Sequence, residues 1–146
     1  MLNKSLEELD GEDWGEPAYD SYVVRTCHAL RRKPIGDLTT EELRLAINQN
    51  IGLQWLLPLA IERLRRDPFI SGDFFEGDLL KAILTVPGTV WERHRDWQRD
   101  VHLIAKAFFS KASGQDDSWR KTCLPGIAAA YESFRQTCSQ TAIDPP

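Results

Sequence analysis

Cys27 and His28 are the first residues of the chain whose types could support nucleophilic catalysis. A histidine can activate a cysteine thiol only where the two side chains are within hydrogen-bond reach. Adjacent residues of a helix point about 100° apart and do not face each other. Cys27 also falls on an apolar stripe with Val23 and Leu30 at helical spacing. We therefore interpret Cys27 as a buried structural thiol and predict no catalytic residue.

The histidines and cysteines lack the spacing of a metal site. His94 and His102 are eight residues apart, whereas ligands on one helix usually lie three or four apart. The cysteines, Cys27, Cys123 and Cys138, form no CxxC pair, and their odd number is typical of reduced thiols in a cytoplasm. We predict neither a metal nor a cofactor.

Two basic clusters, residues 31–33 and 63–66, could contact phosphate groups. Both fall at the expected C-termini of helices, where cations complement the helix dipole. The acidic N-terminal segment is a further partner for these charges. No glycine-containing segment matches a phosphate-binding motif, and the net charge of -4 disfavours binding to phosphates. We therefore predict no direct contact with nucleic acid.

The segment "SLEELDGEDWGEPAYDSY" is the most unusual chemical feature of the chain. Residues 1–20 hold seven carboxylates against one lysine, and Trp14 is the only large apolar residue of the loop at 11–17. The segment is either a solvated face that aids solubility or a docking surface for a basic partner. Trp14 is either an exposed anchor or, as we expect, a structural residue that holds the loop on the second helix. The candidate contact residues are Glu7, Glu8, Asp10, Glu12, Asp13 and Glu16.

Helices must position these residues, because no segment alternates apolar and polar side chains as a strand does. Ser5 and Glu8 form a capping-box pattern that predicts a short helix over residues 6–10. A second helix is expected from an N-cap at Asp20 or Ser21 to about Arg32.

The third helix has the clearest start. Thr39 and Glu42 form a capping-box pattern, and Leu38 with Leu43 forms a hydrophobic staple. A fourth, strongly apolar helix is predicted over residues 53–66, where Pro58 either kinks the helix or begins a new one.

Three further helices are expected. "DLLKAILTV" predicts a short helix that Pro87-Gly88 closes, and a stripe from Trp97 to Phe108 predicts an amphipathic helix that reaches about Ser110. A last helix should follow Pro125-Gly126, with an apolar face formed by Ile127, Ala130, Tyr131, Phe134 and Cys138. The prediction is an all-α, compact, single-domain bundle of six to eight helices over residues 1–146.

Composition agrees with a folded protein in an aqueous compartment. A chain of 146 residues with 42% hydrophobic residues and five tryptophans can bury about 70% of its unfolded surface. The longest apolar run, "WLLPLAI", has seven residues, far fewer than the ~20 that cross a bilayer. No signal peptide is visible, so we expect a cytoplasmic protein that binds no membrane.

Several blocks of sequence stand in a distinctive order: "SLEELDGEDWGEP", "VRTCHALRRKPIGDLTTEELRLAINQNIGL", "PLAIERLRRDP" and "GDFFEGDLLKAILTVP", followed by Trp91. Together these blocks resemble the immunity proteins of bacterial contact-dependent growth inhibition (CDI) systems. They cover about residues 5–91, and residues 92–146 are an unmatched helical extension. Within the blocks, Trp14, Cys27, Leu38, Thr39, Glu42 and Leu43 are interpreted as residues that define the fold.

The resemblance implies a protein without enzymatic activity. It would bind the C-terminal toxin domain of a large surface effector, often a nuclease, and occlude its active or substrate-binding site. The carboxylates from Glu7 to Glu16 would then face the basic surface of a nuclease. The alternatives are a helical adaptor with a different partner and an enzyme that uses His28 or His94.

Overall fold

The computed structural model of the chain describes residues 1–18 and 20–143, with side chains described as far as Cys138. Apart from one isolated bridge between Ser5 and Pro34, these residues contain no β-structure, so the all-α prediction is confirmed. In chain order the described helices are α1 (Leu6–Asp10), α2 (Tyr22–Leu30), η1 (Ile35–Asp37), α3 (Thr40–Asn48), α4 (Leu53–Arg66), α5 (Asp78–Leu84), α6 (Gly88–Arg93), α7 (Arg95–Lys111), η2 (Ala112–Gly114), α8 (Asp117–Thr122) and α9 (Leu124–Ile143).

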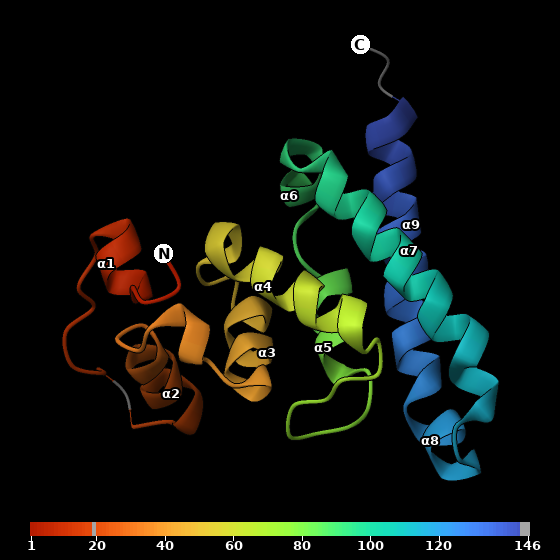
Figure 1. Ribbon diagram of the computed structural model, residues 1–146, viewed down its shortest axis with the longest axis horizontal. Coiled ribbons are helices and arrows are strands. Elements are labelled where there is room, and N and C mark those ends of the chain that lie inside the picture. The colour runs from red at the N-terminus through yellow and green to blue at the C-terminus, as the bar shows by residue number, and fades with distance from the viewer. Residues whose placement is uncertain (19, 144–146) are drawn as a thin grey trace.

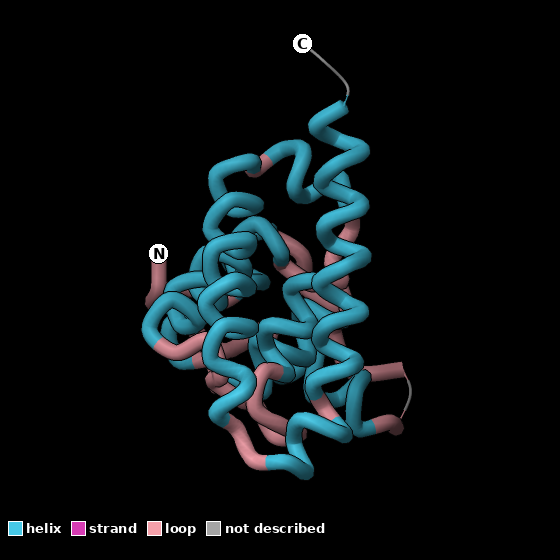
Figure 2. The backbone as a smooth tube through the Cα atoms, turned by 90° about the vertical axis from the view of Figure 1, so that its right-hand side faces the viewer, coloured by secondary structure: helices cyan, strands magenta, loops and turns pink. Residues whose placement is uncertain are grey.

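The helices are arranged along the long axis of the molecule. Helices α1 and α2 form one end, α3 to α5 form the middle, and the long helices α7 and α9 form the other end (Figure 1). Figure 2 shows α9 along its length, as the helix that runs toward the end marked C. Aromatic contacts join α7 to α9, since the ring centroids of Phe109 and Tyr131 are 5.2 Å apart. None of the described helices is both long and apolar enough to span a lipid bilayer.

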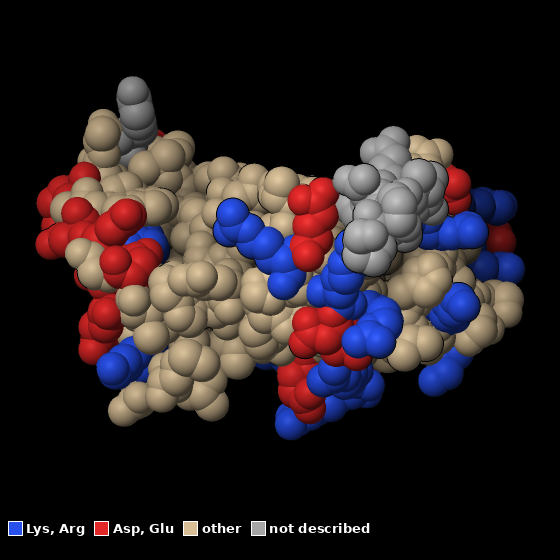
Figure 3. All heavy atoms as spheres, turned by 90° about the horizontal axis from the view of Figure 1, so that it is seen from above, with Lys and Arg blue, Asp and Glu red and all other residues tan. Residues whose placement is uncertain are grey.

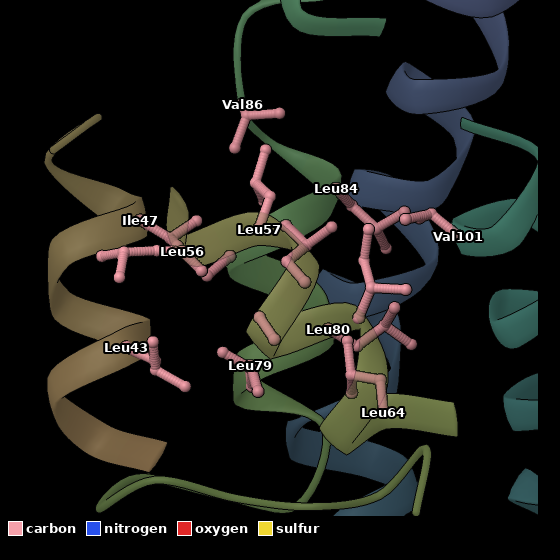
Figure 4. Packing of buried hydrophobic residues seen from close by; sticks show 14 of the residues in the cluster. Leu43, Ile47, Leu56, Leu57, Leu64, Leu79, Leu80, Leu84, Val86 and Val101 are labelled. Atoms are coloured by element: carbon pink, nitrogen blue, oxygen red, sulfur yellow. The ribbon is translucent and has the colours of Figure 1, made fainter. Parts of the chain in front are cut away.

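The core runs through the middle of this arrangement. In Figure 4, leucine and isoleucine side chains from α3, α4 and α5 meet, and Val101 of α7 lies beside them. The cluster extends to α1 through Leu6 and to α9 through Ile127 and Phe134, all at most 1% exposed. One continuous set of apolar contacts therefore connects the two ends of the molecule.

The predicted helix starts are present. Both capping boxes form, with the Ser5 and Thr39 hydroxyls accepting from the N–H groups of Glu8 and Glu42. Pro58 lies inside one uninterrupted helix, α4, so no new helix begins there. Gly52 precedes α4 with φ +60°, and a Cβ there would lie 2.6 Å from a methyl carbon of Leu6. The close approach of α1 to the start of α4 therefore depends on glycine.

Three details differ from the sequence-based prediction. Helix α9 begins before Pro125-Gly126, because proline is tolerated in the first helical turn. The described residues hold nine α-helices rather than six to eight. The two helices that were not predicted, α6 and α8, have six residues each and are too short to show a periodic pattern. Val23 is 38% exposed and therefore stands outside the apolar stripe of Cys27 and Leu30.

A buried arginine holds the N-terminal segment against α2. Arg31 is 2% exposed, and its two terminal nitrogens donate to the two carboxylate oxygens of Asp10, each at 2.9 Å. One of these nitrogens also donates to the Glu12 carbonyl oxygen at 2.9 Å. The Trp14 ring covers the same guanidinium at 4.4 Å. These contacts set the path of residues 10–14.

We predict that Asp10→Asn destabilises the protein by about 3 kcal/mol, because it removes the counter-charge of a buried guanidinium. Asp13→Asn is the matched control, since Asp13 is exposed and its amide analogue can still accept from the Gly15 N–H. Urea unfolding at pH 7 measures both variants. Equal stability of the two variants would contradict the structural role of the Asp10–Arg31 pair.

Acid should destabilise the fold in a defined pH range. Hydrogen bonds from Arg31 lower the pKa of Asp10, and hydrogen bonds from Arg44 lower the pKa of Glu41. A carboxyl group with a lowered folded-state pKa stabilises fully above its unfolded pKa, about 3.9 for Asp and 4.3 for Glu. That stabilisation is lost as the pH falls through the folded-state pKa values.

We therefore expect the free energy of unfolding to be level near pH 7 and to fall steadily below about pH 5. The Asp10→Asn variant should lose less stability than the wild type between pH 7 and pH 3. Urea unfolding at a series of pH values measures both slopes. Parallel curves for the two proteins would show that Asp10 does not contribute to the acid response.

Candidate binding surface

Three of the six candidate acidic residues make contacts within the N-terminal end. Asp10 pairs with Arg31, and Glu7 accepts from Arg32 Nε at 3.4 Å. The Glu8 carboxylate accepts from the backbone N–H of Ser5 at 3.2 Å and so completes the capping box of α1. These three carboxylates hold α1 and its cap in place.

The other three candidates, Glu12, Asp13 and Glu16, are exposed. Asp13 accepts from the Gly15 N–H at 2.8 Å, which supports the local turn. The Glu16 side chain is 89% exposed, and its carboxylate lies 3.8 Å from the nearest Arg32 nitrogen. Carboxylates gather over the end that holds α1 (Figure 3). The outward negative charge of the predicted surface is thus carried by these three residues together with Glu8, which completes the capping box and is also exposed.

Trp14 lies over α2 and retains an accessible face. Its ring meets the His28 ring edge-on, with centroids 5.2 Å apart, and covers the guanidinium of Arg31. It remains 39% exposed. Trp14 therefore holds the loop on α2.

The Cys27 and His28 side chains have separate structural environments. Burial raises the pKa of the Cys27 thiol, which keeps the thiol protonated and weakens it as a nucleophile. His28 Nδ1 lies 3.1 Å from the Gly15 carbonyl oxygen, so this ring joins α2 to the acidic loop. Leu38 and Leu43 are buried as the staple of α3, and Thr39 and Glu42 form its capping box.

The other histidines contact aromatic rings. His94 stacks on Trp97 with centroids 3.6 Å apart, and His102 lies beside Tyr131 at 5.6 Å. Burial, with the nearby cations Lys106 and Arg135, lowers the pKa of His102. In the part of the chain that the structure describes, no three His, Cys, Asp or Glu side chains gather as metal ligands.

The second basic cluster connects helices. Arg63 donates to the Leu38 carbonyl oxygen at 2.6 Å and to the Thr40 hydroxyl at 3.2 Å, which ties the end of α4 to the start of α3. Arg65 pairs with Glu62 and with Asp100 of α7. Both arginines are thus engaged within the protein.

Sequence patterns did not reveal a groove between α4, α6 and the start of α7. The groove has a volume of about 300 Å³, and Trp55, Val90, Arg93, His94 and Trp97 line much of it. Trp97 was predicted as part of an apolar helix face, and Trp55 lies in the helix predicted as strongly apolar over residues 53–66. Both tryptophans are only half-buried. Helical periodicity shows which face of a helix is apolar, but it does not show whether another helix covers that face.

The chain matches a known protein family. A family model described as "CDI immunity proteins" matches residues 8–101, which include the acidic loop, the Arg31 contacts and the helices from α2 to α6. Neither the curated proteins nor the solved structures that were searched gave a match. The family match covers well over half of the chain, and we conclude that this protein belongs to the family of CDI immunity proteins.

Proposed function

We propose that this immunity protein acts in the cytoplasm by binding the C-terminal toxin domain of its cognate effector. The toxin in this proposal is a nuclease, and the immunity protein occludes its active or substrate-binding site. Membership of the CDI immunity family supports the general role, a protein that protects against a CDI toxin.

The observation that carries the finer proposal is the exposed acidic patch formed by Glu12, Asp13 and Glu16. A nuclease holds phosphates with basic side chains, so its substrate site attracts such a patch. The Arg31 and Trp14 contacts keep residues 10–14 in one conformation before binding. Preorganisation lowers the entropy cost of association.

We infer that residues 1–146 act as one domain in which the extension after the matched region supports the fold. Ile127 and Phe134 of α9 belong to the same core cluster as Leu6 of α1. A Cβ at Gly77, at the start of α5, would come within 2.8 Å of Ile127, so α5 and α9 pack closely.

Two alternatives are weaker. A helical adaptor with a different partner would have no reason to match the immunity family. An enzyme that uses His28 or His94 would need an activated group beside the imidazole. The rings of these histidines instead pack on Trp14 and Trp97, respectively.

Co-expression tests the proposed function. Cells that express the cognate toxin domain should survive when they also produce this protein, and purified protein should inhibit the toxin's nuclease activity at about one equivalent. A toxin domain of the same activity from another system is the control, because pair-specific binding should leave it active. Cell death despite abundant folded protein would refute the proposal.

We predict that the triple variant Glu12→Gln, Asp13→Asn, Glu16→Gln slows association with the toxin about tenfold at low salt. The effect should shrink as salt rises, because exposed charges are screened within about 8 Å at physiological ionic strength. The dissociation rate should change little, since no desolvated contact is removed. Stopped-flow kinetics at low and high salt measures these rates.

A triple variant with the same charge change elsewhere is the control. Asp73→Asn, Glu76→Gln and Glu132→Gln neutralise exposed carboxylates outside the acidic end. This control should lose much less association rate, and circular dichroism should confirm the fold of both proteins. Equal rates for the two triple variants would assign Glu12, Asp13 and Glu16 to solubility alone.

A further inference from the structure

The groove between α4, α6 and α7 brings together two tryptophans that are only half-buried, Trp55 and Trp97. Of the other tryptophans, Trp91 and Trp119 are buried, at 1% and 5% exposure, and Trp14 is 39% exposed over Arg31. Exposure of a tryptophan side chain to water is unfavourable, because burial of its large apolar surface lowers the free energy. The open groove therefore presents apolar surface that a partner could cover.

The rim of the groove carries a cation without a counter-charge. Arg93 is exposed, and among the described residues no carboxylate lies within 4 Å of its guanidinium. His94, also in the lining, is stacked on Trp97 in nearly parallel planes, 9° apart. A partner group that complements this site is apolar at its centre and negatively charged at its edge.

The groove also adjoins the acidic end of the molecule. Gly52 and Leu53 form part of its lining at the start of α4. Gly52 packs directly against Leu6 of α1, the helix that precedes the acidic loop. In Figure 3, uncharged surface lies next to the carboxylates of that end. Helix α1, which leads into the acidic loop, therefore packs beside one end of the groove.

Two other hollows lined by described residues offer less to a partner. One of about 220 Å³ is bordered by Arg44, but this guanidinium is already paired with Glu41 and lies 3.9 Å from Asp78. Another of about 410 Å³ follows small side chains of α9, including Ala129 and Ser133, and contains no tryptophan. Trp and Arg are the residues that most often dominate binding energy at interfaces.

We propose that the groove is the second contact site for the cognate toxin, and that it receives an apolar side chain of the toxin flanked by a carboxylate. Trp55 and Trp97 enclose the apolar group, and Arg93 pairs with the carboxylate. This inference rests on the proposed function and deepens it: the acidic patch speeds encounter, and the desolvated contact in the groove holds the complex together.

Binding kinetics of the purified toxin domain tests the proposal with three single variants. Arg93→Glu should weaken binding at least about tenfold, mainly through faster dissociation, because it places like charges in contact. Gln54→Trp should have a similar effect by filling the groove from an exposed position. Trp97→Ala should weaken binding about 30-fold, as truncation of a central aromatic residue does.

Lys106→Glu is the matched control for the charge reversal, because Lys106 is exposed on α7 and does not line the groove. It should bind the toxin with nearly wild-type affinity. Thermal melts should show that Arg93→Glu and Gln54→Trp fold normally, so their effects do not depend on the stability of Trp97→Ala. A toxin variant with an acidic residue changed to lysine that restores binding to Arg93→Glu would identify the paired carboxylate.

The outcomes separate the two proposals. If the wild-type protein does not bind the toxin, the proposed function fails, and the groove fails with it as a toxin contact. If the wild type binds and the folded Arg93→Glu and Gln54→Trp variants bind equally well, only the groove proposal is overturned. A change in self-association of these variants, with unchanged toxin affinity, would assign the groove to a second copy of the chain and would also overturn it.

Discussion

The buried guanidinium of Arg31 organises the acidic end of this protein. A charge taken out of water is costly unless a counter-charge and hydrogen bonds surround it, and Asp10, the Glu12 carbonyl and the Trp14 ring supply these. Its Nε–H is the one buried side-chain polar group in the described part of the chain that has no acceptor. The buried guanidinium therefore needs several partners at fixed positions. The path of residues 10–14 around Arg31 supplies most of these partners.

This arrangement separates two roles within one acidic sequence. Asp10 and Glu7 pair with Arg31 and Arg32, which directly follow the end of α2. The outward carboxylates, Glu12, Asp13 and Glu16, are left to act on the surroundings. Negative charge at one end of a molecule with a small net charge would speed the encounter with a basic partner, as the proposed function requires. In that proposal the structural role and the recognition role depend on different members of the same segment.

Association speed and complex lifetime place different demands on a surface. Exposed charges act over several ångströms and affect encounter, whereas lifetime depends on groups that lose water on binding. The acidic patch suits the first demand. The groove with Trp55, Trp97 and Arg93 suits the second. Because α1 packs on the start of α4 through Leu6 and Gly52, the core keeps these two features in a defined relation.

Local patterns in the sequence determined where most helices begin and that the fold is all-α. The capping boxes at Ser5 and Thr39 involve residues three positions apart, so all of their hydrogen bonds form within one helical turn. The resemblance in residues 5–91 likewise led to the right family. Short helices such as α6 escaped prediction, since six residues do not display a period.

Only the tertiary structure decided which acidic residues face inward and which surface remains open. The partner of Asp10 is 21 residues away in the chain, and no local rule links the two positions. The groove likewise combines residues from α4, α6 and α7, each of which has an ordinary amphipathic or short sequence. The burial of a side chain and the pairing of a charge depend on which distant segments pack beside the residue. Local sequence patterns do not contain this information, because the complete fold determines which segments meet.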